Sequence, residues 1–241
     1  MQILNLGCGT KVSKRQEVIN IDWSIYLRVK RNPFLRLFVP LLFRGARLQQ
    51  YLELGDNVMT HNLANGIPFP DASVDVAYHS HVLEHLDPPI AERFLLEIKR
   101  VLKPGGILRI AVPDMESVCR RYLEHINIAT RDPIESSIHD TYIAAIIGQC
   151  VQREASGSSR QSPTRRLIEN LLLGDARKRG QTHQWMYDRV SLCALLQRLG
   201  YKEPKVFTFN TSMIPDWHTY GFDQSSEGEY IPGSLYIEAC V

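Results

Sequence analysis

The segment QILNLGCGT, residues 2–10, decides the expected fold of this chain. Its apolar residues run directly into Gly-Cys-Gly, which is typical of a buried strand that ends in a tight turn. Glycines at positions 7 and 9 allow a backbone to approach a ligand closely. In open parallel sheets, ligands bind beyond the carboxyl ends of the strands. The segment therefore predicts a first strand with a binding loop at its end.

Strand-like and helix-like segments alternate along the rest of the chain. Further strands are expected at 17–22, 57–63, 73–80, 107–113, 205–210 and 234–241, and helices at 88–102 and 191–201. We also expect a short helix between the first two strands. This alternation predicts an α/β fold, with a Rossmann-like, doubly wound, mostly parallel sheet. The last two strands would form an antiparallel edge hairpin at the C-terminus.

Two segments interrupt the pattern, and we interpret both as insertions in a single domain over residues 1–241. Residues 24–53 are basic and apolar and would form a lid; the alternatives are a docking surface for an anionic acceptor or an interfacial helix on anionic lipid. Residues 127–180 are expected to be helical around 134–153 and partly mobile beyond it. The apolar stretch 34–43 is also a candidate dimer contact, and no oligomeric state is predicted.

Composition narrows the class of protein. The chain has 241 residues, 44% hydrophobic and 22% charged, as in ordinary globular proteins. Its net charge of +2 does not indicate a dedicated nucleic-acid binder, so no nucleic-acid partner is expected. Five scattered cysteines favour reduced thiols and a cytoplasmic location, and no signal peptide is expected. The longest apolar run contains Arg36 and Pro40 and is too short to span a bilayer, which leaves peripheral membrane contact open.

The segment HSHVLEHL, residues 79–86, contains the His-x-x-Glu-His pattern of one class of zinc peptidases. On a helix, His81 and His85 would share one face, with Glu84 beside them as a base. Judged alone, the pattern predicts a metallohydrolase that takes a third ligand from elsewhere.

The neighbouring motifs favour a different function. LNLGCGT (4–10), INID (19–22), the segment from His61 to Leu86, and RVLKPGGILRIAVPD (100–114) resemble, in order and spacing, the motifs of class I S-adenosylmethionine-dependent methyltransferases. The resemblance extends to residues 183–201 and to the closing SLYIEACV. It implies that S-adenosylmethionine is the cofactor. It also implies that VLEHL is a common sequence in the family at the end of the fourth strand, so that no metal is expected.

The resemblance assigns cofactor-binding roles to ten residues. Leu6, Gly7, Cys8 and Gly9 would pass under the methionine part, Asp22 would hold the ribose hydroxyls with Trp23 beside it, Asn62 and Leu63 would meet the adenine, and His79 and Ser80 would line the pocket. The family commonly has an acid where Asn62 stands, although an amide oxygen also accepts a hydrogen bond. Lys11 falls near the place of a third glycine.

The expected reaction is methyl transfer to a small-molecule or saccharide-type acceptor, at oxygen. An alcohol acceptor usually needs a general base, and His81 and His183 are the candidates. Alternatively, His81 contacts the cofactor or ties its loop, and His183 binds the substrate or ties its loop. Asp114 and Asp188 could instead cap the helices that follow them. Two other functions remain open: a catalytically silent cofactor-binding partner or regulatory protein, and a nicotinamide oxidoreductase, which Val12 and the short gap to Asp22 disfavour.

Overall fold

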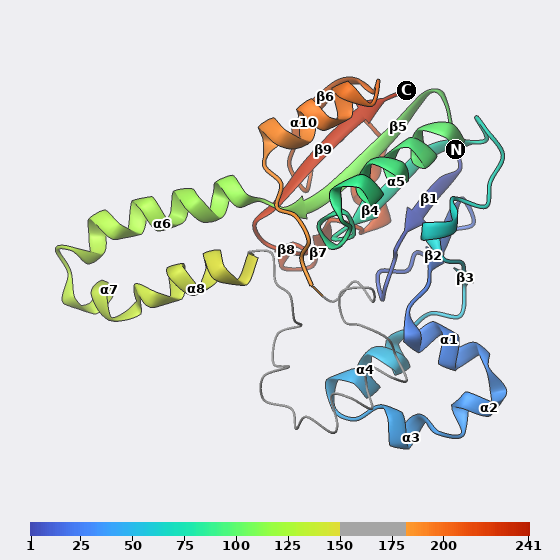
Figure 1. Cartoon of the computed structure of the whole chain (residues 1–241), viewed down its shortest axis with the longest axis horizontal. Coiled ribbons are helices and arrows are strands. Elements are labelled where there is room, and N and C mark those ends of the chain that lie inside the picture. Colours follow the sequence, from blue (N-terminus) through green and yellow to red (C-terminus); the bar gives the residue numbers. More distant parts are fainter. Residues whose placement is uncertain (150–181) are drawn as a thin grey trace.

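The computed structural model describes residues 1–149 and 182–241, and its centre is a seven-stranded sheet (Figure 1). The strands are β1 Ile3–Leu6, β2 Val18–Asp22, β3 Val58–Thr60, β4 Val74–Ser80, β5 Leu102–Pro113, β6 Lys202–Phe207 and β9 Ser234–Cys240. Their order in the sheet is β3-β2-β1-β4-β5-β9-β6. The first five strands pair in parallel, and β9 is antiparallel to both neighbours. The predicted fold class, including the antiparallel C-terminal strands, is confirmed.

Two helices pack on one face of the sheet, α5 (Pro88–Val101) and α10 (Arg189–Arg198). Apolar residues at helical spacing on α5, including Phe94, Leu95 and Ile98, enter the main hydrophobic core. In α10, Leu192 and Leu196 do the same. The helix at 88–102 is thus confirmed. The strand that follows begins five residues earlier than expected, because Leu102 already pairs with Val74 before an irregularity in the register.

The expected short helix between the first two strands was wrong. Residues 7–17 form a loop without helix, held by the side chains of two buried asparagines, Asn5 and Asn20. The Asn5 amide donates to the Lys11 carbonyl over 2.7 Å. Asn20 donates to the Ser13 carbonyl over 2.8 Å and accepts from the Ser13 N–H over 3.1 Å. These bonds satisfy backbone groups that a helix would otherwise have paired.

The other face of the sheet is covered by the segment that follows β6. Ile214, Trp217 and Phe222 pack there against Tyr78 and its neighbours on the sheet. Trp217 begins the 3-10 helix η4 (Trp217–Tyr220), and a two-stranded sheet, β7 (Gln224–Ser225) with β8 (Gly228–Glu229), follows it.

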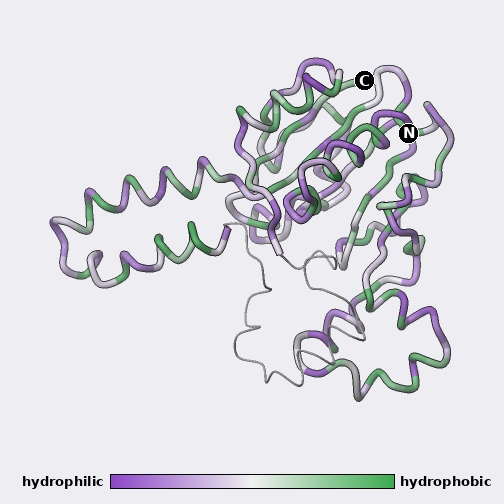
Figure 2. Tube along the Cα trace, viewed as in Figure 1, coloured by the Kyte–Doolittle hydropathy of each residue, from purple (hydrophilic) through white to green (hydrophobic). Residues whose placement is uncertain are grey.

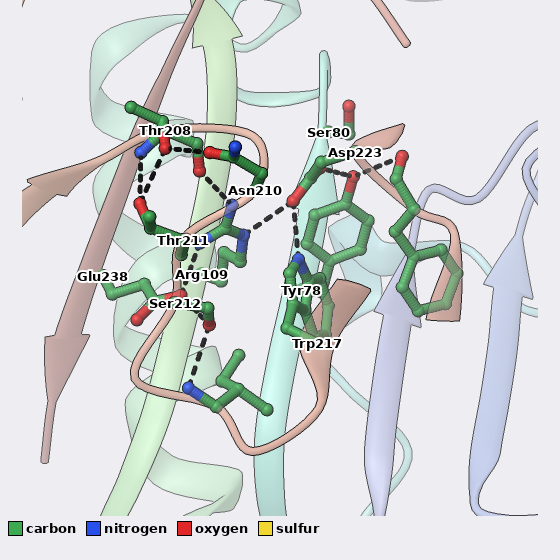
Figure 3. A network of polar contacts seen from close by, with 12 residues as sticks. Tyr78, Ser80, Arg109, Thr208, Asn210, Thr211, Ser212, Trp217, Asp223 and Glu238 are labelled. Carbon is green, nitrogen blue, oxygen red and sulfur yellow. Dashed lines mark hydrogen bonds and ion pairs between the residues drawn. The ribbon is translucent and has the colours of Figure 1, made fainter. Parts of the chain in front are cut away.

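A buried polar network ties this segment to the strands (Figure 3). Arg109 on β5 is fully buried and pairs with Asp223 over 2.7 Å and with Glu238 on β9 over 2.5 Å. Its guanidinium also donates to the carbonyls of Thr208 and Thr211, each over 3.0 Å. The network fixes the path of residues 208–223 across the sheet.

The two segments interpreted as insertions are largely helical where the structure describes them. Four short helices join β2 to β3: α1 Ile25–Arg31, α2 Pro33–Arg36, α3 Val39–Leu42 and α4 Ala46–Glu53. After β5, α6 (Met115–Ala129) projects from the sheet, and α7 (Pro133–Ile138) and α8 (Asp140–Gln149) return beside it (Figure 1). The helix expected around 134–153 is therefore two helices with His139 between them, and its last residues, with the rest of the insertion to 180, lie outside the described residues.

Hydrophobic and hydrophilic residues alternate along α6 and α8 (Figure 2), and both helices keep large apolar side chains exposed, among them Leu123 and Ile147. Among the described residues, no helix has the length and apolar character needed to cross a membrane.

Candidate functional site

The loop after β1 lies against the end of β2. The backbone N–H groups of Gly7 and Cys8 both donate to the carbonyl of Ile21, over 2.8 and 3.1 Å. Gly7 has φ +66°, and a Cβ atom added to it would lie 2.6 Å from Cγ2 of Val82. Glycine is therefore required here both for the backbone conformation and for the close approach of the loop after β4.

Asp22, the last residue of β2, anchors the same loop. Its carboxylate accepts from the Gly9 N–H over 2.6 Å and from the Ser24 N–H over 2.7 Å. Burial raises the pKa of Asp22 above its usual value, although these backbone N–H groups act in the opposite direction. A carboxylate offers about four acceptor positions, so these two bonds leave room for a hydroxyl donor of a ligand.

The other residues assigned to the cofactor surround this corner of the sheet. Cys8 is buried, and burial raises the pKa of its thiol, which keeps it neutral. Trp23 is 44% exposed and carries the guanidinium of Arg28 over its ring. Asn62 caps the 3-10 helix η1 (Leu63–Asn65), and its side chain accepts from the Ala64 N–H over 3.1 Å.

The two assigned residues at the end of β4 face different surroundings. His79 is fully buried and packs on Phe94, with ring centroids 5.4 Å apart. Burial lowers the pKa of His79 to about 4, so its side chain is a neutral core residue. Ser80 is partly exposed, and its hydroxyl accepts from Nζ of Lys11 over 3.3 Å.

Lys11 is the site residue that sequence reasoning did not single out. Its ammonium lies between Ser80 and the ring of Tyr230, 3.9 Å from the ring centroid. Burial lowers the pKa of Lys11 to about 8, against the attraction of Asp223. In the sequence it was visible only as the residue that stands near the place of a third glycine.

His81 follows β4 in a left-handed backbone conformation with φ +54°, which is uncommon for a residue with a side chain. Nε2 of His81 lies 3.0 Å from the Ser234 hydroxyl, and Nδ1 lies 3.1 Å from a carboxylate oxygen of Glu84. Both ring nitrogens therefore already have neighbours, and His81 ties the loop after β4 to β9 and to Glu84.

Glu84 and His85 belong to the 3-10 helix η2 (Leu83–His85), and the segment around His183 is hydrogen-bonded to this helix. The backbone carbonyl of Glu84 accepts from the N–H groups of Gln184 and Trp185, over 2.6 and 3.2 Å. The rings of His85 and His183 stand edge to face with centroids 5.0 Å apart. The structure thus brings both predicted catalytic histidines to Glu84.

Two acids considered for the site are helix caps. The Asp114 side chain accepts from the Glu116 N–H at the start of α6, and Asp188 and Ser191 form a capping box at the start of α10. Gly7, Cys8, Gly9 and Asp22 gather at the ends of β1 and β2, with Ser80 and His81 at the end of the adjacent β4.

Known proteins resemble parts of this chain. Residues 46–110 match a family model described as a methyltransferase domain. An uncharacterized methyltransferase of Schizosaccharomyces pombe is 43% identical over 53 residues, which are 22% of this chain and 18% of that protein. A probable S-adenosylmethionine-dependent methyltransferase of Mycobacterium tuberculosis is 46% identical over 57 residues, which are 24% of this chain and 20% of that protein. The aligned stretch thus spans about a fifth of each relative's length.

Among solved structures, a SAM-dependent methyltransferase from Archaeoglobus fulgidus is similar with a TM-score of 0.43 and 14% identity. The comparison covers 100% of this chain and 86% of that one.

Proposed function

We propose that this chain is a class I S-adenosylmethionine-dependent methyltransferase, which binds S-adenosylmethionine and transfers its methyl group to an acceptor. The bond between the Gly9 N–H and the Asp22 carboxylate carries the proposal. It holds a glycine loop and an acidic acceptor together at the carboxyl ends of adjacent parallel strands, where ligands of such sheets bind.

Within this proposal, the remaining acceptor positions of Asp22 take the ribose hydroxyls. The backbone of residues 6–9 lies under the methionine part, and Trp23, Asn62 and Leu63 flank the adenosine. Ser80, with the backbone of His79, lines the side of the pocket next to β4. S-Adenosylmethionine supplies an electrophilic methyl group with a good leaving group, so the chain's own task is to align the acceptor.

We propose oxygen as the acceptor atom, in a small molecule or a saccharide-type substrate. A hydroxyl group must lose its proton during methylation, whereas methylation of an amine depends less on a base held by the protein. His81, Glu84 and His183 gather beyond β4, next to the place where the methyl group would lie. This group as a whole, and no single member, is assigned the acceptor's proton.

Calorimetry with S-adenosylmethionine and S-adenosylhomocysteine tests the cofactor proposal. Asp22→Asn removes the charge and leaves one oxygen, so at least one hydrogen bond to a charged group, worth about 1.5–3 kcal/mol, is lost. The expected result is about 10- to 150-fold weaker binding. Asp56→Asn is the matched control, since the Asp56 side chain is 93% exposed and should not affect binding. Failure of the unmutated chain to bind either compound would contradict the proposal.

Formation of S-adenosylhomocysteine with panels of phenols, sugars and primary amines tests the acceptor. Turnover with hydroxyl compounds supports O-methylation, and turnover with amines alone contradicts it. Intact cofactor binding without turnover in any panel favours the silent cofactor-binding protein.

A further inference from the structure

Glu84, His85 and His183 form a cluster of potential metal ligands, and we propose that it binds one divalent transition-metal ion of the zinc type. One ligand atom from each residue lies within 4.8 Å of the other two. Nε2 of His85 is 3.9 Å from Oε1 of Glu84. Ligands held about 2.0–2.1 Å from Zn²⁺ in a tetrahedron lie about 3.3 Å apart, so small side-chain rotations would close the cluster on an ion.

The surroundings of the Glu84 carboxylate are the first observation that supports a cation site. Glu84 is 1% exposed, and neither carboxylate oxygen accepts a hydrogen bond from any residue that the structure describes. Nδ1 of His81 lies 3.1 Å from Oε1 of Glu84 but outside hydrogen-bond alignment. Buried carboxylates without partners are rare because desolvation is costly. A bound cation would supply the partner.

The two imidazoles are oriented as metal ligands. Nδ1 of His85 lies 3.2 Å from the carbonyl of Thr182, and Nδ1 of His183 lies 3.2 Å from the carbonyl of Gln149. Because a carbonyl can only accept, Nδ1 is the donor in each contact, which leaves Nε2 of each ring as the nitrogen available to a metal ion. A backbone carbonyl behind each histidine is the usual support of a ligating imidazole.

The ligand set indicates which metals fit. Two imidazoles and one carboxylate suit Zn²⁺, Mn²⁺, Fe²⁺ or Co²⁺, whereas Mg²⁺ and Ca²⁺ prefer oxygen ligands alone. Three protein ligands leave a position open, as in catalytic zinc sites. A cavity of about 10 Å³, lined in part by Glu84, His183 and Tyr187, adjoins the cluster and is close to the least volume that holds a water molecule.

A second group of histidines, His125 in α6 and His139 at the end of α7, does not offer free ring nitrogens in the same way. Nδ1 of His125 lies 2.9 Å from Nδ1 of His139, and Nε2 of His125 lies 3.1 Å from a carboxylate oxygen of Glu135. Both nitrogens of His125 are engaged, so it has no lone pair to offer without breaking a contact. This group provides a control for the proposed site.

Metal binding at this site is a property additional to methyl transfer and does not depend on it. It uses the Glu84 and His85 of the His-x-x-Glu-His pattern, with His183 as the third ligand and His81 as a residue that positions Glu84. If the proposed function holds, a hydroxyl acceptor bound at the open position would lose its proton more readily. That last consequence rests on the proposed function, while metal binding itself does not.

The test is titration of the full chain with CoCl₂ after treatment with a chelator, followed by calorimetry and by absorption. We expect one equivalent to bind with a spectrum of nitrogen and oxygen ligation. Losing a ligand should weaken binding by more than the roughly 10- to 100-fold typical of losing a supporting residue. Glu84→Gln and His183→Ala should both show this, and His139→Ala should bind as the unmutated chain does.

Three results would overturn the proposal: no binding, binding that survives His183→Ala, or binding that His139→Ala abolishes. A thiolate-to-cobalt absorption band would also overturn it, because it would place the ion on a cysteine. If Glu84→Gln fails to fold by circular dichroism, the partly exposed His183 decides the outcome. Binding of S-adenosylhomocysteine, measured on the same samples without cobalt, separates failure of this site from failure of the proposed function.

Discussion

Replacing Arg109 by methionine tests whether the buried polar network holds the sheet together. The guanidinium is fully buried and donates four hydrogen bonds, to Asp223, Glu238 and the carbonyls of Thr208 and Thr211. Methionine has a similar length but no charge and no donor. The substitution leaves two buried carboxylates, those of Asp223 and Glu238, without the cation that both of them contact.

The expected cost follows from that unbalanced charge. Removing one partner of a buried ion pair costs about 3–5 kcal/mol. Asp223 would keep the Tyr78 hydroxyl and the Trp217 indole N–H as donors, and Glu238 would keep the Ser212 hydroxyl. These neutral donors place the loss within that range and not above it. For a chain of this size it corresponds to a fall in Tm of about 6–20 °C.

Thermal unfolding followed by circular dichroism measures the effect. The control is Arg198→Met, the same substitution in an ion pair with Glu92 that lies on the surface. Exposed ion pairs contribute little to stability, so this variant should unfold near the temperature of the unmutated chain. If Arg109→Met changes Tm no more than Arg198→Met does, the network does not stabilise the sheet as argued.

Three further predictions concern the site and its supports. Gly7→Ala should weaken S-adenosylhomocysteine binding and lower Tm, since its Cβ meets Val82 and the left-handed backbone alone costs about 1–2 kcal/mol; adding Val82→Ala should restore only the part due to the clash. Because the pKa of His79 is lowered to about 4 in the folded chain, the unfolded chain binds a proton first as pH falls, and the free energy of unfolding should drop by about 3 kcal/mol between pH 6.5 and pH 4. Urea unfolding of His79→Leu should not show this drop, and an equal drop in the variant would refute the assignment. Asp188→Ala should cost about 0.5–2 kcal/mol in thermal unfolding by removing the bond to the Ser191 N–H, while an unchanged Tm would mean that the capping box contributes nothing.

The position of the glycine loop beside Asp22 could be predicted because its signals are local. A short apolar run followed by Gly-Cys-Gly specifies a strand and a turn, and Asp22 ends the next apolar run. Parallel pairing then places both ends at one edge of the sheet. The helix caps at Asp114 and Asp188 could be anticipated for the same reason, since a cap bonds to N–H groups two or three residues away.

Other features could not be predicted from local sequence signals, because they depend on hydrogen bonds and contacts formed in the folded chain. The loop between β1 and β2 replaces an expected helix because Asn5 and Asn20 bond its backbone, and nothing in the spacing of apolar residues shows such bonds. Arg109 stands between apolar neighbours in β5, and its partners Asp223 and Glu238 come from distant parts of the chain. Lys11 gains its importance from Ser80 and Tyr230, which it meets only in the folded chain.

By itself, the sequence determined the order of the sheet strands, the helix at 88–102, and the glycine loop with its acid, because these depend on short-range sterics, hydrogen bonding and hydrophobic periodicity. Only the tertiary structure decided what the His-x-x-Glu-His segment does. His81 and His85 do not present one helical face; instead, Glu84 draws the backbone of Gln184 and Trp185 to itself and brings His183 beside His85. That meeting depends on how distant segments pack, and burial then leaves the Glu84 carboxylate without a hydrogen-bond donor among the described residues.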